Sequence, residues 1–359
     1  MKVGLVGLPN SGKTTVFNLL TGQRLPTGPF FTEGHVVHLG SVHIPDERVD
    51  FLHTFYPRAK AKYAELVFVD MAGVPVGGAG HGSKGQLFAS VHDTDALVYV
   101  VAAFDDERVT RPFETVDPVR DIETLELELM VADVELVDKR LERVRKELQA
   151  AKDKHSPELD VLVRCKEALE AERPVRGLAL NPDEAKLVVG FRFLTQKPAI
   201  VLVNTGEDAL GQPPPDDVQA ACKARGLPVF AMSAKIEEEV AELPPAEQQA
   251  FLDELGIAES GLKKFVHTVY GALDLQAFFT ANDHEVHAWT LPSGAAAVEA
   301  AAKVHTDMAR GFIRAEIMAF ADIKAAGSPK AAKEAGHLRV EGKEYIVRDG
   351  DVIFFRFNV

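Results

Sequence analysis

The chain has 359 residues, of which 46% are hydrophobic and 26% are charged, as is ordinary for a globular protein of two or three domains. Its formal net charge of −14 argues against the broad positive field of a protein that coats nucleic acid, so DNA is not an expected partner. The two cysteines match no metal-binding spacing, and no apolar run approaches the roughly 20 residues of a membrane-spanning helix. We therefore expect a cytoplasmic protein that has no membrane partner.

The N-terminal part begins with the pattern of a strand, a glycine-rich turn and a helix. Apolar residues predict a strand at 3–7, and helical spacing follows at 14–20. Further strand-like runs are separated by segments long enough for crossover helices. These runs lie at 66–69, 96–101, 199–203 and 229–232. The alternation predicts an α/β fold with a mostly parallel, doubly wound sheet.

Residues 121–197 contain no strand-like run and carry a helical pattern instead. Apolar residues step by three and four as in a coiled-coil seam, at Val134, Val137, Leu141, Val144 and Leu148. A break at 155–157 separates this stretch from a second helical stretch at 158–172, so we predict an inserted antiparallel hairpin. Its first helix also carries basic residues, which are either a solvated face paired with nearby acids or contacts for phosphate groups. They are Lys139, Arg140, Arg143, Arg145 and Lys146.

The C-terminal part is predicted to be a small mixed sheet around one helix. A helical stretch at 295–308 lies among short strand-like runs. The runs are 286–291, 312–320, 338–340, 345–347 and 352–357. From Ala277 onward there are 10 basic and 11 acidic residues, so nearly all of the negative excess precedes this part. The expected domains are a sheet domain of residues 1–120 and 198–276, a helical insert of 121–197 and a C-terminal domain of 277–359.

Residues 7–14 carry G-x-x-x-x-G-K-T directly between the first predicted strand and the first predicted helix. The glycines let backbone N–H groups approach phosphate oxygens, and the helix N-terminus adds the positive end of its dipole. Lys13 would neutralise the outer phosphates, and the Thr14 hydroxyl would bind Mg²⁺. The alternative, a glycine-rich turn with an incidental lysine, does not account for this strand, loop and helix context.

Asp70 and Gly73 form a D-x-x-G motif at the end of the next predicted strand. Asp70 would hold the metal through its water shell, and the Gly73 amide would sense a γ-phosphate. The glycine-rich residues 74–86 are expected to order and disorder with the nucleotide state, the alternative being a plain flexible loop. Between the first helix and the next strand, Thr32 offers a hydroxyl that would complete the Mg²⁺ shell.

The last two predicted strands end in motifs that are expected to contact a base. The first reads N-T-G-E at 204–207, and the second reads S-A-K at 233–235. GTPases carry N-K-x-D and S-A-K at these positions. The substitutions at Thr205 and Glu207 therefore bear on which base is bound.

The order of G-x-P-N-x-G-K-T, F-T, D-x-A-G, N-x-x-E and S-A-K resembles that of the translation-factor-like (TRAFAC class) P-loop NTPases. Further segments resemble the YchF-type Obg-like ATPase family over essentially the whole chain, among them VDPVRDIETL at 116–125, ADVE at 132–135, RVEGKEY at 339–345 and DGDVIFFRFNV at 349–359. The resemblance implies a G domain, an inserted coiled coil and a C-terminal TGS domain of β-grasp shape. It also implies that the protein hydrolyses ATP in preference to GTP and associates with ribosomes.

Carried over by motif, the resemblance implies a site for ATP and Mg²⁺. The nucleotide-binding residues would be Asn10, Ser11, Gly12, Lys13, Thr14, Thr15, Asp70, Gly73, Asn204, Thr205, Gly206, Glu207, Ser233, Ala234 and Lys235. Thr14 and Thr32 would bind Mg²⁺, and Asn10 is by analogy a candidate ligand for K⁺. The family often has a histidine proposed to aid hydrolysis where this chain has Arg111. Arg111 and His81, which lies in the segment after Gly73, are the candidate catalytic residues.

Three functions stay open at this point. The first is a slow ATPase switch with ribosomal RNA and ribosomal protein as partners. The second is a guanine-specific GTPase of the same architecture. Thr205 and Glu207 are the residues that distinguish it from the first. The third is a nucleotide-sensing module that does not hydrolyse, which follows if nothing near Val74 supports attack by water.

Overall fold

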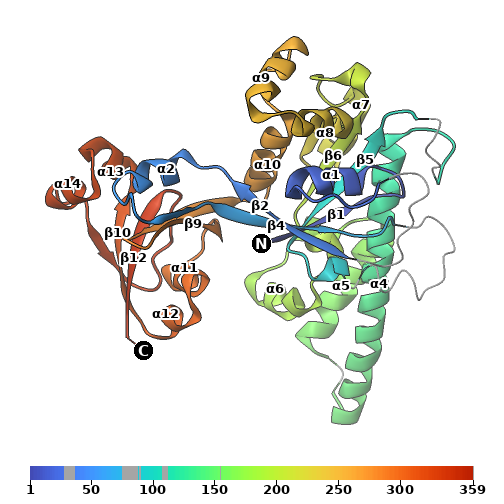
Figure 1. The fold of residues 1–359 in the computed structure, drawn as a ribbon. Helices are drawn as coiled ribbons and strands as arrows, with labels where there is room; N and C mark the ends of the chain where they lie inside the picture. Colours follow the sequence, from blue (N-terminus) through green and yellow to red (C-terminus); the bar gives the residue numbers. More distant parts are fainter. Residues whose placement is uncertain (28–36, 75–87, 89, 107–111, 154, 359) are drawn as a thin grey trace. The chain divides into compact units, whose positions relative to one another are not determined.

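The computed structural model describes residues 1–27, 37–74, 88, 90–106, 112–153 and 155–358 (Figure 1). The chain forms two compact units. The smaller unit comprises Met1, Ser41–Leu66 and Val266–Val359, and the larger comprises Lys2–Gly40 and Val67–Phe265. The described residues contain two six-stranded sheets, which are taken in turn.

The first sheet has the strand order β2-β4-β1-β5-β6-β7. Its strands are β1 (Lys2–Val6), β2 (His38–Ile44), β4 (Ala64–Asp70), β5 (Ala96–Ala103), β6 (Ala199–Thr205) and β7 (Val229–Met232). All the pairs from β4 to β7 are parallel. In β5, Tyr99 and Val101 belong to the core on one face, while Val98 and Val100, which point to the other face, are also fully buried. The predicted α/β fold with a mostly parallel, doubly wound sheet is confirmed.

The helices of the larger unit lie beside this sheet, and two of them form a long helical pair (Figure 1). They are α1 (Lys13–Thr21), α4 (Pro118–Ala151), α5 (Pro157–Glu170), α6 (Pro182–Val188), α7 (Asp216–Ala224), α8 (Ala234–Glu242) and α9 (Pro245–Glu254). Helix α10 (Gly261–Ala272) begins in the larger unit and belongs to the smaller unit from Val266 on. Ile122 and Leu125 of α4 pack with Val218 of α7 on the face of the sheet that carries Tyr99. Within the described residues, no helix combines the length and the apolar character that crossing a membrane requires.

The pair formed by α4 and α5 follows from local signals. Asp117 accepts a hydrogen bond from the Arg120 N–H at 3.0 Å and caps the 34-residue α4, while Ser156 caps α5 in the same way. The predicted seam residues of α4 pack in one cluster with Val161, Leu162 and Cys165 of α5. Across the pair, Arg140 donates from Nε and Nη2 to the two carboxylate oxygens of Glu158 at 2.7 and 2.9 Å.

The second sheet has the order β11-β10-β12-β8-β9-β3. Its strands are β3 (Lys60–Lys62), β8 (Leu275–Ala281), β9 (Glu285–Pro292), β10 (Phe312–Ala319), β11 (Arg339–Glu341) and β12 (Asp351–Phe357). Both parallel and antiparallel pairs occur, as predicted for a mixed sheet. Helix α11 (Ala297–Val304) buries alanines at 297, 300 and 301 against Ile317, Ile353 and Phe355 of the sheet. Short helices complete the unit: α12 (Thr306–Arg310), α13 (Phe320–Ala326) and α14 (Pro329–Glu334).

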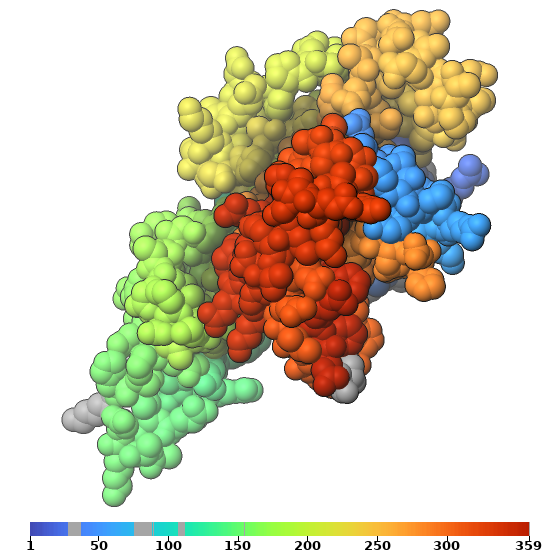
Figure 2. All heavy atoms as spheres, turned by 90° about the vertical axis from the view of Figure 1, so that its left-hand side faces the viewer, coloured from blue at the N-terminus to red at the C-terminus, as the bar shows by residue number. Residues whose placement is uncertain are grey.

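The segment 41–66 is an unexpected part of this unit. Helix α2 (Glu47–His53) places Arg48 at 2.6 Å from Asp349 and 4.9 Å above the Phe279 ring, and β3 pairs in parallel with β9. In Figure 2 the blue atoms of this segment lie beside the orange and red atoms of the C-terminal part. The strand predicted at 345–347 is wrong, because only Ile346 forms an isolated bridge there, with Ala296.

Candidate functional site

The loop after β1 adopts a conformation that few residues tolerate. Asn10 and Gly12 have φ angles of 62° and 93°, in the left-handed region. At Gly7 a Cβ atom would lie 2.4 Å from the Val100 carbonyl oxygen, so no side chain fits. Gly12 is also the N-cap of α1, and its carbonyl accepts a hydrogen bond from the Val16 N–H at 2.9 Å. The loop therefore wraps the N-terminus of a helix, an arrangement that binds anions.

Lys13 brings a positive charge to this loop in a buried position. The residue is 5% exposed, and Nζ donates to the Leu8 carbonyl at 2.9 Å. Burial lowers the pKa of the Lys13 ammonium to about 8, an effect that the Asp70 carboxylate partly offsets. A buried ammonium gains when an anion binds beside it. Lys13 is thus placed to hold a phosphate group.

Asp70 at the end of β4 lies beside Thr14 of α1. The Thr14 hydroxyl donates to Asp70 Oδ2 at 2.9 Å, and within the described residues the buried Oδ1 accepts no hydrogen bond. Burial raises the pKa of Asp70, while Lys13 and the Thr14 hydroxyl oppose this shift. A hydroxyl and a carboxylate with an unused oxygen are the hard ligands that Mg²⁺ prefers. The residues present therefore fit the metal.

Gly73 and Val74 place the end of the D-x-x-G motif against the loop of residues 7–12. A Cβ atom at Gly73 would lie 2.7 Å from the Pro9 nitrogen, and the Val74 N–H donates to the Gly7 carbonyl at 2.9 Å. The Val74 side chain is 1% exposed and belongs to the core. A buried apolar side chain cannot orient a water molecule at this position.

Asn204 joins the ends of three loops. Its Nδ2 donates to the Ser11 carbonyl at 3.2 Å, and its Oδ1 accepts from the Ala234 N–H at 3.0 Å. The residue is 5% exposed, and both ends of its amide make hydrogen bonds within the protein. Beside it, Ser233 Oγ is buried and has no hydrogen-bond partner within the described part of the chain. Asn204 thereby sets the distance between the phosphate loop and the S-A-K motif.

Glu207 and Lys235 form an ion pair at the outer end of β6 and β7. Their side chains are 57% and 65% exposed, so the pair lies at the surface, whereas Thr205 is buried. The Glu207 carboxylate is thus already bound by the lysine of the S-A-K motif. A carboxylate in this state is not presented to a base as in an N-K-x-D site.

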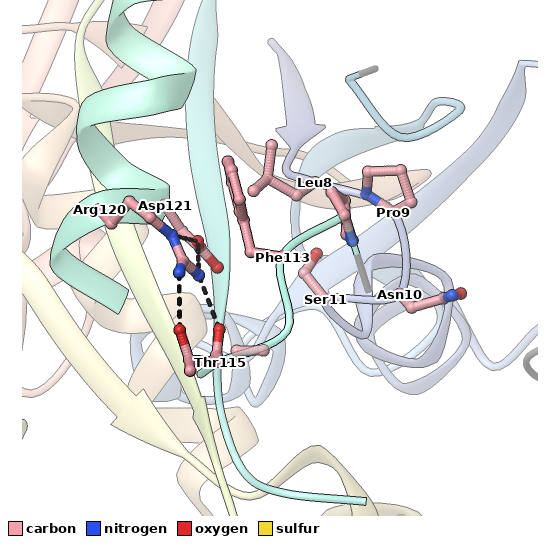
Figure 3. Close-up of a pocket in the computed structure, with 10 residues that line it drawn as sticks. Leu8, Pro9, Asn10, Ser11, Phe113, Thr115, Arg120 and Asp121 are labelled. Carbon is pink, nitrogen blue, oxygen red and sulfur yellow. Dashed lines mark hydrogen bonds and ion pairs between the residues drawn. The ribbon is translucent and has the colours of Figure 1, made fainter. Parts of the chain in front are cut away.

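The structure brings most of the predicted site residues together around one loop. Hydrogen bonds link Thr14 with Asp70 and Asn204 with Ser11 and Ala234. The backbone of Gly12 lies close to Asn204 and that of Gly73 close to Pro9, and the Lys13 and Asp70 charges interact. Glu207 and Lys235 form a separate pair. The predicted ligand Thr32 and the predicted catalytic residues His81 and Arg111 lie outside the described residues. Sequence reasoning missed Phe113, Thr115 and Arg120, which line a recess beside the phosphate loop (Figure 3). The Asp-Pro at 117–118 marks the start of α4, but nothing in the pattern places these side chains beside the loop.

The fold and this set of contacts define an α/β protein of the P-loop GTPase fold. A family model described as a 50S ribosome-binding GTPase matches residues 2–159, and a YchF C-terminal model described as a protein of unknown function matches 275–358. The Ribosome-binding ATPase YchF of Bacillus subtilis is 41% identical over 367 residues, covering all of both chains. Obg-like ATPase 1 of Caenorhabditis elegans is 39% identical over 367 residues, covering all of this chain and 92% of the relative.

A solved structure agrees with these relatives. The YchF GTPase of Schizosaccharomyces pombe superposes with a TM-score of 0.80 and 28% identity, covering 99% of this chain and 97% of that one. The chain belongs to the YchF family. The resemblance inferred from the motifs is therefore confirmed at the level of the family.

Proposed function

We propose that this protein is a nucleotide-dependent switch that binds ATP in preference to GTP, hydrolyses it to ADP and phosphate, and acts on the ribosome. The observation that carries the proposal is the joined set of Lys13, Thr14, Asp70 and Gly73 around one loop. A relative that is 41% identical over its whole length is named a ribosome-binding ATPase, which supports the partner and the reaction.

Residues in and around the phosphate loop have proposed roles toward the nucleotide. Lys13 would hold the outer phosphates, the Thr14 hydroxyl would bind Mg²⁺, and Asp70 would accept hydrogen bonds from the metal's water shell. Mg²⁺ supplies charge that neutralises the phosphate oxygens. Thr32 remains the proposed further Mg²⁺ ligand, and Asn10 the proposed K⁺ ligand.

Hydrolysis by the protein alone is expected to be slow. Because the Val74 side chain is apolar and buried, another group must orient the attacking water, and His81 and Arg111 are the candidates. Arg111 is always protonated, so it would stabilise charge rather than act as a base. We expect single-turnover rates below about 1 s⁻¹ without a partner, as in other switch NTPases. Rapid-quench measurement of ADP formation checks this.

The outcomes of that measurement distinguish between the proposed functions and test the two candidate catalytic residues. A fast rate that persists in the His81→Ala, Arg111→Ala double variant would contradict the assignment of both residues. Binding of ATP with no ADP formed, even with ribosomes present, would favour the nucleotide-sensing module that does not hydrolyse. Acceleration by ribosomes is the result expected of a switch.

The exposed basic residues of α4 are the proposed contacts for ribosomal RNA. Lys139, Arg143, Arg145 and Lys146 are exposed, whereas Arg140 is held by Glu158 and stabilises the helical pair. We expect reversal of Arg143, Arg145 and Lys146 to glutamate to weaken ribosome binding about tenfold or more. Binding should also fall less steeply with added salt, because each lost phosphate contact reduces the number of counterions released. Co-sedimentation at several salt concentrations measures both effects.

A control with the same change in net charge separates a local contact from general repulsion. Arg173, Lys186 and Lys223 are exposed residues of the same unit that lie outside α4. Their joint reversal to glutamate should leave ribosome binding within about twofold of the unmodified protein. Equal losses in both triple variants would count against RNA contacts by α4.

A further inference from the structure

A recess beside the phosphate loop has one wall made of residues that the nucleotide motifs do not include. Leu8, Pro9, Asn10 and Ser11 form one side, and Phe113, Thr115, Arg120 and Asp121 form the other (Figure 3). Residues 112–115 follow β5 and lead into α4, so the wall belongs to the connection between a central strand and the helix that covers it.

Arg120 is the residue that holds this wall in place. Its Nη1 donates to Thr115 Oγ1 at 3.0 Å, and its Nη2 donates to the Thr115 carbonyl at 2.8 Å. Nε and Nη2 also donate to Asp121 Oδ1 at 3.2 and 2.9 Å. The guanidinium carbon lies 4.1 Å from the centre of the Phe113 ring. One planar cation thus binds a main-chain carbonyl, a hydroxyl, a carboxylate and an aromatic face, a combination that lysine cannot reproduce.

The loop on the other side of the recess needs such support. Asn10 holds a left-handed conformation, which costs a residue other than glycine free energy and is kept only where its surroundings fix it. Ser11 is 3% exposed, and its Oγ has no hydrogen-bond partner within the described residues. Phe113 packs against the same core cluster as Leu8. If residues 112–115 moved away from the loop, the Asn10 backbone and the Ser11 hydroxyl could both change conformation.

We propose that Arg120 is a positioning residue for nucleotide binding, which clamps residues 112–115 against the phosphate loop and so preorganises the loop. The inference rests on the proposed binding of the nucleotide at residues 7–14. Because the wall packs against the core cluster that contains Leu8 and holds no group proposed to touch a reacting atom, losing the clamp weakens ATP and ADP binding alike and spares the chemical step.

The test compares two arginines that both anchor α4. Arg225 donates from Nη2 to Glu123 Oε1 of α4 at 2.7 Å, and its side chain is 28% exposed, as is that of Arg120, yet it does not line the recess. The variants are Arg120→Met, Arg120→Lys and the matched control Arg225→Met. Calorimetry measures the Kd of Mg·ATP and Mg·ADP, thermal unfolding measures stability, and steady-state kinetics separates KM from kcat.

We expect Arg120→Met to raise both Kd values by about 3- to 10-fold, with kcat within about twofold, and Arg120→Lys to recover less than half of the loss. Arg225→Met should leave both Kd values within about twofold even where it lowers the unfolding temperature. Should Arg120→Met fail to fold, Phe113→Leu removes the aromatic contact with Arg120, keeps an apolar side chain at this position, and is expected to raise both Kd values about 2- to 5-fold.

Three results would overturn the inference. One is an unchanged Kd in Arg120→Met, or in Phe113→Leu where that variant replaces it. Another is an equal rise in Arg225→Met, which would reduce Arg120 to a general anchor of α4. The third is a fall in kcat at constant KM. Failure of the unmodified protein to bind either nucleotide would instead remove the proposed function, so the two failures are distinguishable.

Discussion

Lys13→Ala is expected to lower the affinity for ATP by about 10- to 100-fold. The ammonium is buried beside the phosphate loop, with its Nζ directed to the Leu8 carbonyl, and a charge-assisted hydrogen bond to a phosphate is worth roughly 1.5 to 3 kcal/mol. Calorimetric titration of the nucleotide-free protein with Mg·ATP measures the loss directly. Unchanged affinity in this variant would remove the assignment of residues 7–14 as the phosphate loop.

A second buried lysine provides the control. Lys197 is 7% exposed, and its Nζ donates to the carbonyls of Val91, His92 and Thr94 at 2.6, 2.9 and 2.6 Å. Burial lowers its pKa to about 8, as for Lys13. Lys197→Met leaves three carbonyls without their donor, so we expect a lower unfolding temperature with nucleotide affinity within about twofold. Replacing Lys13 should thus lower nucleotide affinity, whereas replacing Lys197 should lower stability.

The nucleotide motifs could be read from the sequence because they are local. A strand, a glycine-rich loop and a helix occupy about 20 consecutive residues, and the left-handed conformations at Asn10 and Gly12 are built within that stretch. Continuous apolar runs likewise indicated the buried strands β5 and β6. The predicted positions of Lys13, Thr14 and Asp70 therefore needed no knowledge of distant contacts.

Other features depend on contacts between distant residues and left no pattern to read. Strand β3 has the sequence Lys-Ala-Lys and is exposed, so it has no apolar alternation, and it becomes a strand only because β9 pairs with it. Asn204 looks like a base-contacting residue, yet its amide joins Ser11 to Ala234. The contact between Phe113 and Arg120 likewise depends on how the chain turns between β5 and α4.

We expect the choice of base to depend on whether the Glu207 carboxylate is free or paired. In an N-K-x-D site, a free carboxylate accepts hydrogen bonds from guanine N1–H and the 2-amino group, while the lysine stem packs along the ring. Here the Glu207 carboxylate is paired with Lys235, and the buried Thr205 has no such stem. Since the Asn204 amide already serves Ser11 and Ala234, the main-chain carbonyls of the 204–207 turn are the acceptors that we expect for the adenine 6-amino group.

ATP is therefore expected to bind at least about 10-fold more tightly than GTP, because guanine would leave its N1–H and 2-amino donors poorly paired, at roughly 1 to 3 kcal/mol for each buried group. Parallel titrations with ATP and GTP at one salt concentration measure the ratio. The Thr205→Lys, Glu207→Asp double variant should shift the ratio partly toward GTP, since it restores the stem and shortens the carboxylate.

Lys235→Met tests the effect of the ion pair on base choice without changing Glu207 itself. It releases Glu207 without shortening it, and a free carboxylate facing adenine meets the N1 lone pair, which repels it. We expect the preference for ATP to fall about 2- to 5-fold in this variant, because ATP binds more weakly and guanine N1–H gains an acceptor. A ratio that does not change in Lys235→Met would show that the pair has no part in base choice. Equal or tighter binding of GTP by the unmodified protein would instead favour the guanine-specific GTPase, because the exposed pair would then open to present Glu207 to guanine N1–H.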